Sequence, residues 1–320
     1  MRVFFLFLDG VGLGPAEQNP FAHAKLPTLT ALAGGQPWLF GAEPHTGETA
    51  SFRPIDATLG VEGRPQSATG QATLLSGVNV PAATGGHYGP KPTDAIRAIL
   101  DEHNSIADIT GSGRTGALLN AYPSGFFERL ESGKMLLSSN QYGLRQAGIA
   151  MRDGTAFYEG QALSVDFTGE MWFRHVAAND AAYALWRDKM GHDEPLTLSP
   201  REAGRRMAML AKENDFTFFD QWLTDYIGHR GTLEEAVALL EKLDAAVAGI
   251  LDEWDTARDM VLITSDHGNI EAIEERTHTH NPVPLLIIGA DHAEAAAAVR
   301  DLADVAGVLR GAFGLQSAGM

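Results

Sequence analysis

The apolar run from Val3 to Leu8 constrains the fold of this chain more than any other segment, because it ends abruptly at Asp9 and a glycine-rich loop. A short run with no polar position is typical of a strand buried on both faces, as in a parallel sheet covered by helices. Asp9 interrupts the run too early for a signal peptide, and no small-residue cleavage site follows. Ligands collect just past the carboxyl ends of strands in an open α/β sheet, so we expect Asp9 at a binding edge.

The second half of the chain alternates between helix and strand patterns. Apolar residues recur every three or four positions from Thr232 to Trp254, which predicts an amphipathic helix. Buried strands are expected over Met260–Thr264 and Pro284–Gly289, and a mostly helical stretch over His292–Phe313. This alternation predicts a doubly wound α/β core.

The middle of the chain loses this alternation and becomes rich in Gly, Ser, Tyr and polar residues. We predict an inserted cap or substrate domain over residues 89–198, and a catalytic core made of residues 1–88 and 199–320. Strand-like pieces occur at Thr115–Ala121 and Ala162–Phe167, and helix patterns at Ala177–Met190 and Pro200–Glu213.

Charge and cysteine content limit the function classes. The net charge of −17 argues against a nucleic-acid partner, since such binding depends on Lys and Arg neutralising phosphates. No apolar stretch approaches the roughly 20 residues of a membrane span. The chain has no cysteine, which fits a cytoplasmic protein and leaves only oxygen and nitrogen ligands for a metal.

Asp and His recur together in segments far apart in the sequence, at spacings that suit metal binding. The segments are Asp225 to His229, the pair Asp266-His267, and His278 to His280, with Asp9 at the other end of the chain. Carboxylates mixed with imidazoles suit Zn²⁺ or Mn²⁺, and enough of them for two ions indicates phosphoryl transfer. Each segment alone is also compatible with a capped turn, a surface pair or a loop histidine.

A candidate nucleophile lies in the segment Gly63 to Gly77, which holds the hydroxyls of Ser67 and Thr69. A hydroxyl at a helix amino terminus beside cations is favoured as an alkoxide and can carry a phosphoryl group. The pattern alone does not separate the two, and both could be helix-capping residues.

Together these segments resemble the metal-site motifs of the alkaline phosphatase superfamily, most closely its cofactor-independent phosphoglycerate mutase and phosphopentomutase branch. The resemblance rests on Asp9-Gly10-Val11-Gly12, Asp225-x-x-Gly228-His229, Ser265-Asp266-His267-Gly268-Asn269 and His278-Thr279-x-Asn281-Pro282-Val283-Pro284. It implies a dinuclear Mn or Zn enzyme, a phosphatase or phosphomutase, acting on a small phosphorylated metabolite through a phosphoserine.

The resemblance also implies roles for single residues. One ion would be held by Asp9, Asp266 and His267 and shared with the nucleophile; Asp225, His229 and His278 would hold the other, with His280 second to His278. In the mutases the nucleophile lies three residues before a Gly-His pair. Gly70-Gln71 stands in that place here, so Ser67 is preferred over Thr69.

The chain also departs from the mutase pattern. Gln71 replaces the usual histidine, and the insertion is short and lacks the large mutases' Gly-Gly-Val-His-Ser-His segment. The substrate is therefore not implied. The candidate substrate contacts are all basic or amide side chains in or near the insertion or the first loops: Asn19, Arg64, Lys91, Arg114 and Arg145.

Two alternatives remain open from the sequence. A phosphodiesterase-type or sulfatase-like hydrolase would use the same cations, although the chain lacks the sulfatase Cys/Ser-x-Pro-x-Arg motif. A metal-binding regulatory protein without turnover is the second alternative. Retention of Ser67 beside every expected ligand favours an enzyme.

Overall fold

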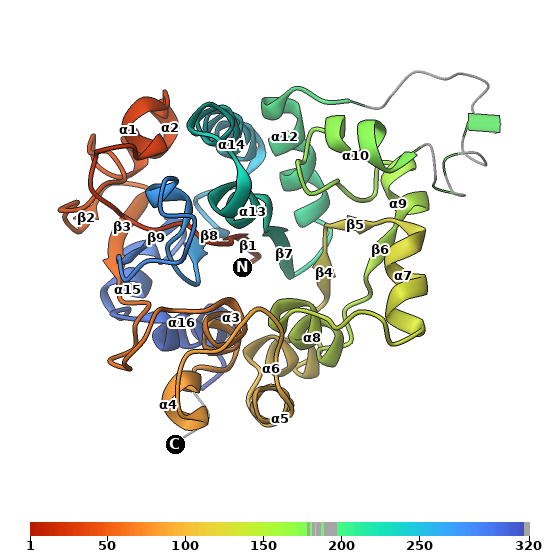
Figure 1. Ribbon diagram of the computed structural model, residues 1–320, viewed down its shortest axis with the longest axis horizontal. Helices are drawn as coiled ribbons and strands as arrows, with labels where there is room; N and C mark the ends of the chain where they lie inside the picture. Colours follow the sequence, from red (N-terminus) through yellow and green to blue (C-terminus); the bar gives the residue numbers. More distant parts are fainter. Residues whose placement is uncertain (178–179, 181–182, 184–186, 189–196, 317–320) are drawn as a thin grey trace.

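A central β-sheet lies between two layers of helices in the computed structural model, which describes residues 1–177, 180, 183, 187–188 and 197–316 (Figure 1). Within these residues the sheet has seven strands in the order β2-β3-β9-β8-β1-β7-β4. The strands are β1 (Val3–Leu8), β2 (His45–Thr46), β3 (Ala50–Ile55), β4 (Gly116–Leu118), β7 (Phe216–Gln221), β8 (Met260–Ser265) and β9 (Val283–Gly289), and a separate parallel pair is formed by β5 (Ala121–Tyr122) and β6 (Arg152–Asp153).

Helices connect and cover these strands. They are α1 (Pro20–His23), α2 (Pro27–Leu32), α3 (Ser67–Ser76), α4 (Val80–Thr84), α5 (Asp94–Glu102), α6 (Ser105–Gly111), α7 (Ser124–Glu131), α8 (Ser139–Gln146), α9 (Gly154–Tyr158), α10 (Glu170–His175), α12 (Pro200–Ala211), α13 (Leu223–Arg230), α14 (Leu233–Glu253), α15 (His292–Ala297) and α16 (Val305–Ala312), with the 3₁₀ helices η2 (Ile270–Ala272) and η3 (Leu302–Asp304).

The pairing of the strands confirms the predicted α/β fold. Strand β1 is parallel to β7 on one side and to β8 on the other, and β4 is parallel to β7. Strand β9 runs antiparallel to β8, and β3 antiparallel to β9, so this side of the sheet is mixed. The buried run Val3–Leu8 is therefore an interior strand of the parallel part, as its apolar pattern predicts.

Strand β1 supplies both hydrophobic cores because its side chains alternate between the two faces of the sheet. Phe4, Leu6 and Leu8 pack in the core that contains residues of α12 and α14. Val3, Phe5 and Phe7 pack in the core that contains residues of α3, α5, α6, α8 and α16. A strand with no polar position therefore packs against both helical layers, and strands β7, β8 and β9 likewise contribute to both cores.

The amphipathic helix expected over Thr232–Trp254 is confirmed as α14, with these two residues as its caps. The Thr232 side chain accepts a hydrogen bond from the backbone N–H of Glu235, and the Glu235 carboxylate accepts one from the backbone N–H of Thr232. This capping box satisfies two amide groups that a helix start leaves without intrahelical partners. The helical stretch expected over His292–Phe313 is interrupted, since α15 and α16 are separated by η3.

The strand-like piece Ala162–Phe167 is not a strand; it makes one isolated bridge, between Leu163 and Asn120. The Asp166 carboxylate accepts hydrogen bonds from Ser164, Thr168 and the backbone of Met171, which fold this segment into a turn. Local side-chain hydrogen bonds of this kind compete with sheet pairing. The helix pattern Ala177–Met190 lies largely outside the described residues.

Strand β4 belongs to the range predicted as the insertion, yet it pairs with β7 in the central sheet. Later in that range, Phe157, Tyr158 and Trp172 form a third, separate hydrophobic cluster around α9 and α10. The division of the chain at residues 88 and 198 stays a prediction.

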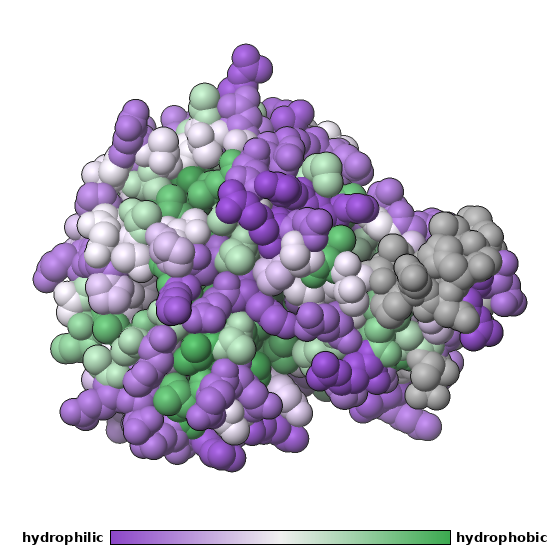
Figure 2. Space-filling view, turned by 90° about the horizontal axis from the view of Figure 1, so that it is seen from above, coloured by the Kyte–Doolittle hydropathy of each residue, from purple (hydrophilic) through white to green (hydrophobic). Residues whose placement is uncertain are grey.

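One face of the molecule carries hydrophobic side chains in separate patches among hydrophilic ones (Figure 2). Among the described helices, none is long and apolar enough to cross a membrane.

Candidate metal centre and cavity

The topology brings four distant segments to one edge of the sheet. Asp9 directly follows β1 and Asp266 directly follows β8, and these strands are parallel, so both side chains lie at the same edge. Helix α13 follows the parallel strand β7 and carries Asp225 and His229. Strand β9 runs in the opposite direction, so the loop before it brings His278 to this edge as well.

The first cluster contains Asp9, Asp266 and His267, whose ligand atoms all lie within 4.8 Å of one another. His267 Nε2 lies 3.3 Å from Asp9 Oδ1 and 3.6 Å from Asp266 Oδ2. The Ser67 hydroxyl lies 3.0 Å from the same nitrogen. All four residues are buried.

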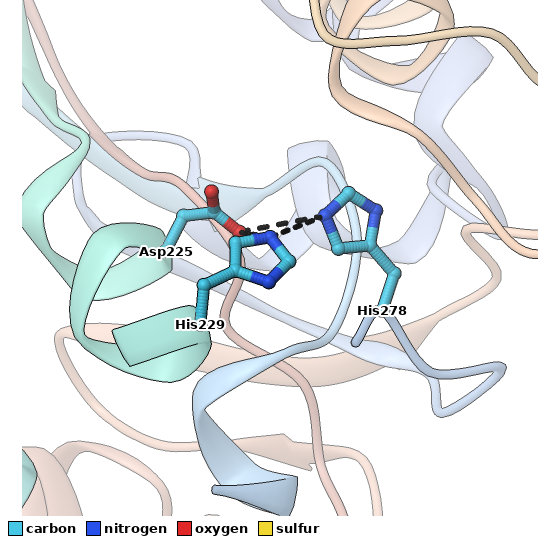
Figure 3. A group of neighbouring side chains, drawn as sticks. All are labelled: Asp225, His229 and His278. Carbon is cyan, nitrogen blue, oxygen red and sulfur yellow. Dashed lines mark hydrogen bonds and ion pairs between the residues drawn. The ribbon is translucent and has the colours of Figure 1, made fainter. Parts of the chain in front are cut away.

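The second cluster contains Asp225, His229 and His278, whose side chains point toward one another from α13 and from the loop before β9 (Figure 3). The two Nε2 atoms of the histidines are 3.1 Å apart. Asp225 Oδ1 lies 3.4 Å from His229 Nε2 and 3.6 Å from His278 Nε2. The rings of His267 and His278 stack with centroids 3.7 Å apart, which joins the two clusters.

The other ring nitrogens of the second cluster fix the tautomers of its histidines. His229 Nδ1 lies 3.0 Å from the carbonyl of Arg276, and His278 Nδ1 lies 2.9 Å from the carbonyl of Pro65. A carbonyl oxygen only accepts, so both Nδ1 atoms are donors and both neutral rings direct an Nε2 lone pair into the cluster. Two lone pairs facing each other fit a shared cation, and such backbone contacts commonly orient metal-binding histidines.

The spacing within each cluster also fits a metal ion. In a four-coordinate site with bonds of about 2.0–2.2 Å, neighbouring ligand atoms lie about 3.4 Å apart. The separations of the Asp225, His229 and His278 ligand atoms, from 3.1 to 3.6 Å, match that value.

The charges of the first cluster are poorly balanced by protein groups. Burial and the Asp266 carboxylate raise the pKa of Asp9 well above its usual value, and burial raises the pKa of Asp266 to about 6. Burial alone would lower the pKa of His267, but the Asp266 and Asp9 carboxylates outweigh it and raise this pKa to about 10. Asp9 Oδ1 and Asp266 Oδ2 are buried without a hydrogen-bond partner. Buried carboxylate oxygens in this state fit a divalent cation.

Glu271 is a buried residue that the sequence reasoning missed, and it links the loops that carry the clusters. One carboxylate oxygen accepts hydrogen bonds from the backbone of Gly12 at 3.0 Å and of Asn269 at 2.7 Å. The other accepts from the side chains of Thr279 and Asn281. Glu271 is the second residue of η2, and no local sequence pattern signals its contacts with three separate segments.

Two amides contact the predicted ligands directly. Asn269 Nδ2 donates to Asp225 Oδ1 at 2.7 Å. Gln71 Nε2 donates to Asp9 Oδ2 at 3.2 Å. The glutamine that replaces the mutase histidine therefore lies beside the first cluster and can orient the Asp9 carboxylate.

The two candidate nucleophiles occupy different positions in α3. Ser67 is its first residue, and its hydroxyl lies beside His267. The Thr69 hydroxyl instead donates to the backbone carbonyl of Gln66 at 3.1 Å, and its side chain is fully buried. This placement favours Ser67, whose role as nucleophile stays a prediction.

A cavity of about 990 Å³ opens onto the clusters. The residues of its lining that belong to the predicted metal centre are Asp9, Ser67, Asp225 and His229. Asp220, at the end of β7, also lines the cavity, and burial together with the Asp9 carboxylate raises its pKa to about 8.

Of the five predicted substrate contacts, the structure places Lys91 in the cavity lining. Burial lowers its pKa, whereas the carboxylates of Asp220 and Asp9 act in the opposite direction. Lys91 is thus a cation held near the first cluster, as a phosphate contact requires.

The other four lie outside the described cavity lining. Asn19 caps α1 and donates to the carbonyl of Gly14, and Arg64 donates to Thr277 on the outside of the His278 loop. Arg114 lies 3.6 Å from Asp215 near the start of β7, and Arg145 is exposed on α8.

His280 is exposed and belongs to neither cluster, which agrees with its second place behind His278.

Comparison with known proteins identifies the class to which this fold and site belong. Residues 1–317 match the model of the Metalloenzyme superfamily, and the chain belongs to this family. Among curated proteins it is similar to the 2,3-bisphosphoglycerate-independent phosphoglycerate mutases of Saccharolobus islandicus and Methylobacillus flagellatus. The first is 24% identical over 58% of this chain and 46% of the relative, and the second 28% identical over 55% and 35%.

These figures confirm the resemblance to the mutase branch, although the chain spans about half the length, or less, of the curated relatives it matches. Among solved structures, a variant of the TAB5 alkaline phosphatase has a TM-score of 0.50 and 11% identity, over 98% of both chains. This last likeness concerns the fold alone. Family and relatives together support metal-dependent phosphoryl transfer in general.

Proposed function

We propose that this protein transfers the phosphoryl group of a small phosphorylated metabolite through a phosphoserine on Ser67, as a phosphatase or a phosphomutase. The observation that carries the proposal is the position of the Ser67 hydroxyl. It lies at the amino terminus of α3, 3.0 Å from His267 Nε2, within the cluster of Asp9 and Asp266. A nucleophile at the edge of a metal-ligand cluster and open to a large cavity suits phosphoryl transfer.

The residues fit two divalent ions, Mn²⁺ or Zn²⁺. Asp9, Asp266 and His267 would hold one, and Asp225, His229 and His278 the other. Ions bound there would lower the pKa of a nearby hydroxyl and neutralise the charge of a phosphoryl group.

In the proposed first step the Ser67 oxygen forms a bond to phosphorus while the bond from phosphorus to the substrate oxygen breaks, and the proton lost by Ser67 ends on the released alcohol. The amino terminus of α3 carries partial positive charge, which favours negative charge on this oxygen. Lys91 donates to a phosphoryl oxygen from the side of the cavity. Gln71 holds the Asp9 carboxylate in place.

In the second step an acceptor oxygen attacks the phosphoserine, the bond from Ser67 to phosphorus breaks, and the proton lost by the acceptor restores the Ser67 hydroxyl. Water as acceptor gives free phosphate and a phosphatase. A second hydroxyl of the same substrate gives an isomer and a phosphomutase. Retransfer requires that the cavity exclude water while the substrate turns.

The test is a turnover screen of the purified protein with Mn²⁺ or Zn²⁺. A generic aryl phosphate, phosphosugars, phosphoglycerates and nucleotides would be assayed for free phosphate and for isomerised product separately. We expect turnover in wild type and none in Ser67→Ala. Full metal occupancy with no turnover on any compound would instead support a non-catalytic metal-binding protein.

A further inference from the structure

The cavity has a second wall, formed by the middle of the chain, that the proposed function does not use. Its lining residues from the middle of the chain are mostly apolar or aromatic: Tyr122, Phe126, Met135, Val165, Met171 and Trp172. Tyr122 and Phe126 stack with ring centroids 4.4 Å apart. We call these six residues the apolar wall.

Three polar side chains beside the apolar wall, Asn120, Gln141 and Asp166, are already paired within the protein, while the basic side chains Arg129 and His175 also line the cavity. Asn120 exchanges hydrogen bonds with the backbone of Asp220 through both atoms of its amide. Gln141 accepts from the backbone of Ser138 and donates to the Tyr122 hydroxyl. The Asp166 carboxylate accepts hydrogen bonds from the side chains of Ser164 and Thr168 and from the backbone of Met171.

This pairing disfavours a substrate rich in hydroxyl groups. A sugar hydroxyl that enters a site must recover there the hydrogen bonds it loses to water, and an unpaired one weakens binding. The cation Arg230 at this cavity lies over the Tyr226 ring, with its guanidinium carbon 5.7 Å from the centroid. Next to the six residues of the apolar wall, Asn120, Gln141 and Asp166 therefore offer few free polar atoms, which suits an apolar group.

Two further aromatic rings, one in α13 and one at its N-cap position, line the cavity beside the second cluster. Trp222 and Tyr226 line the cavity, yet they are 39% and 48% exposed. Their ring centroids are 6.4 Å apart in an edge-to-face arrangement. Large aromatic side chains left exposed beside a cavity commonly mark a ligand-binding surface.

Cavity size agrees with this chemistry. Ligand pockets range from about 300 to 1,000 Å³, and pockets at the upper end accommodate drug-sized molecules. At about 990 Å³ the cavity is far larger than a phosphoglycerate requires.

We propose that the substrate is a phosphate monoester whose alcohol part carries an aromatic ring, with the ring held between Trp222 and Tyr226 on one side and the apolar wall on the other. This inference rests on the proposed function, since the phosphate is placed at the Ser67 cluster. It adds the class of the leaving group, which the motifs of the metal centre leave open.

A matched pair of esters tests the inference: 2-phenylethyl phosphate and ethyl phosphate, which release similar primary alcohols and differ by one ring. With the metal-loaded wild-type protein we expect kcat/KM to be about 100-fold higher for the phenylethyl ester. This is the size of the ratio by which a hydrophobic pocket can distinguish two substrates that differ in apolar surface. Equal values, or a preference for 3-phosphoglycerate over both, would overturn the inference.

Substitutions in the cavity lining test which residues cause the preference for the phenylethyl ester. Trp222→Ala and Phe126→Ala should each lower kcat/KM about tenfold more for the phenylethyl ester than for the ethyl ester. Phe40→Ala is the control, because Phe40 is 68% exposed and outside the described cavity lining; it should leave the ratio unchanged. A ratio unchanged in both cavity variants would contradict the proposed ring position.

Binding separates a failure of this inference from a failure of the proposed function. The affinities of 2-phenylethylphosphonate and ethylphosphonate, which cannot be hydrolysed, would be measured by calorimetry with Mn²⁺ present. Tighter binding of the phenylethyl compound without turnover of either ester would refute phosphoryl transfer and retain the aromatic site. Turnover with equal binding would refute the aromatic site alone.

Discussion

The two walls of the cavity differ in their chemistry and in how their polar atoms are satisfied. At the sheet edge, Asp9 and Asp266 have buried oxygens without hydrogen-bond partners, and the Nε2 lone pairs of His229 and His278 face each other. On the second wall, Asn120, Gln141 and Asp166 are paired within the protein. By our proposals, one wall receives cations and the other receives an apolar group. The reaction and the specificity are therefore separable properties of this molecule.

The largest expected effect comes from removing the proposed nucleophile at the sheet edge. Ser67→Ala should lower kcat by about 10³-fold or more, as is usual when a nucleophile is lost. Thr69→Val removes the neighbouring hydroxyl, which donates to a backbone carbonyl, and should leave kcat within about threefold. Phosphate trapped on Thr69 in a quenched reaction would show that the wrong hydroxyl was chosen.

A smaller effect is expected from the residue that links the cluster loops. Glu271→Gln replaces an acceptor of four hydrogen bonds by a group that also donates, which should loosen the loops of Gly12, Asn269 and Thr279. Metal affinity should fall by about 10–100-fold, measured by titration against a chelator.

Glu275→Gln is the matched control, since Glu275 is exposed nearby on the chain. Equal affinities in wild type and Glu271→Gln would mean that the clusters form without this link.

The smallest expected effect is on kcat/KM and compares a basic residue in the cavity lining, Lys91, with one outside it, Arg145. Lys91→Met should lower kcat/KM about tenfold, because one charge-assisted contact to phosphate contributes roughly 1.5–3 kcal/mol before solvent weakens it. Arg145→Met, on exposed α8, should have no effect on kcat/KM. Similar losses in both variants would indicate a general charge effect instead of a contact in the cavity.

Sequence reasoning predicted the sheet edge better than the second wall, for physical reasons. Strand β1 has its predicted bounds because an apolar run ended by Asp9 has few alternatives. The predicted ligands lie together because strand direction alone brings Asp9 and Asp266 to one edge. Their roles as ligands stay predictions.

The second wall depends on tertiary contacts that no local pattern encodes. Trp172 and Phe126 come from separate short helices with no shared periodicity. Glu271 was missed because one glutamate in a short 3₁₀ helix gives no sign of four partners from three segments.

Metal content measured by elemental analysis tests the central claim most directly. Wild type purified with Mn²⁺ or Zn²⁺ should contain about two ions per chain, because each cluster offers three ligand atoms within 4.8 Å. Asp225→Ala and His267→Ala, which remove one ligand from different clusters, should each lower that content. Unchanged metal content in both variants would contradict the assignment of the two clusters.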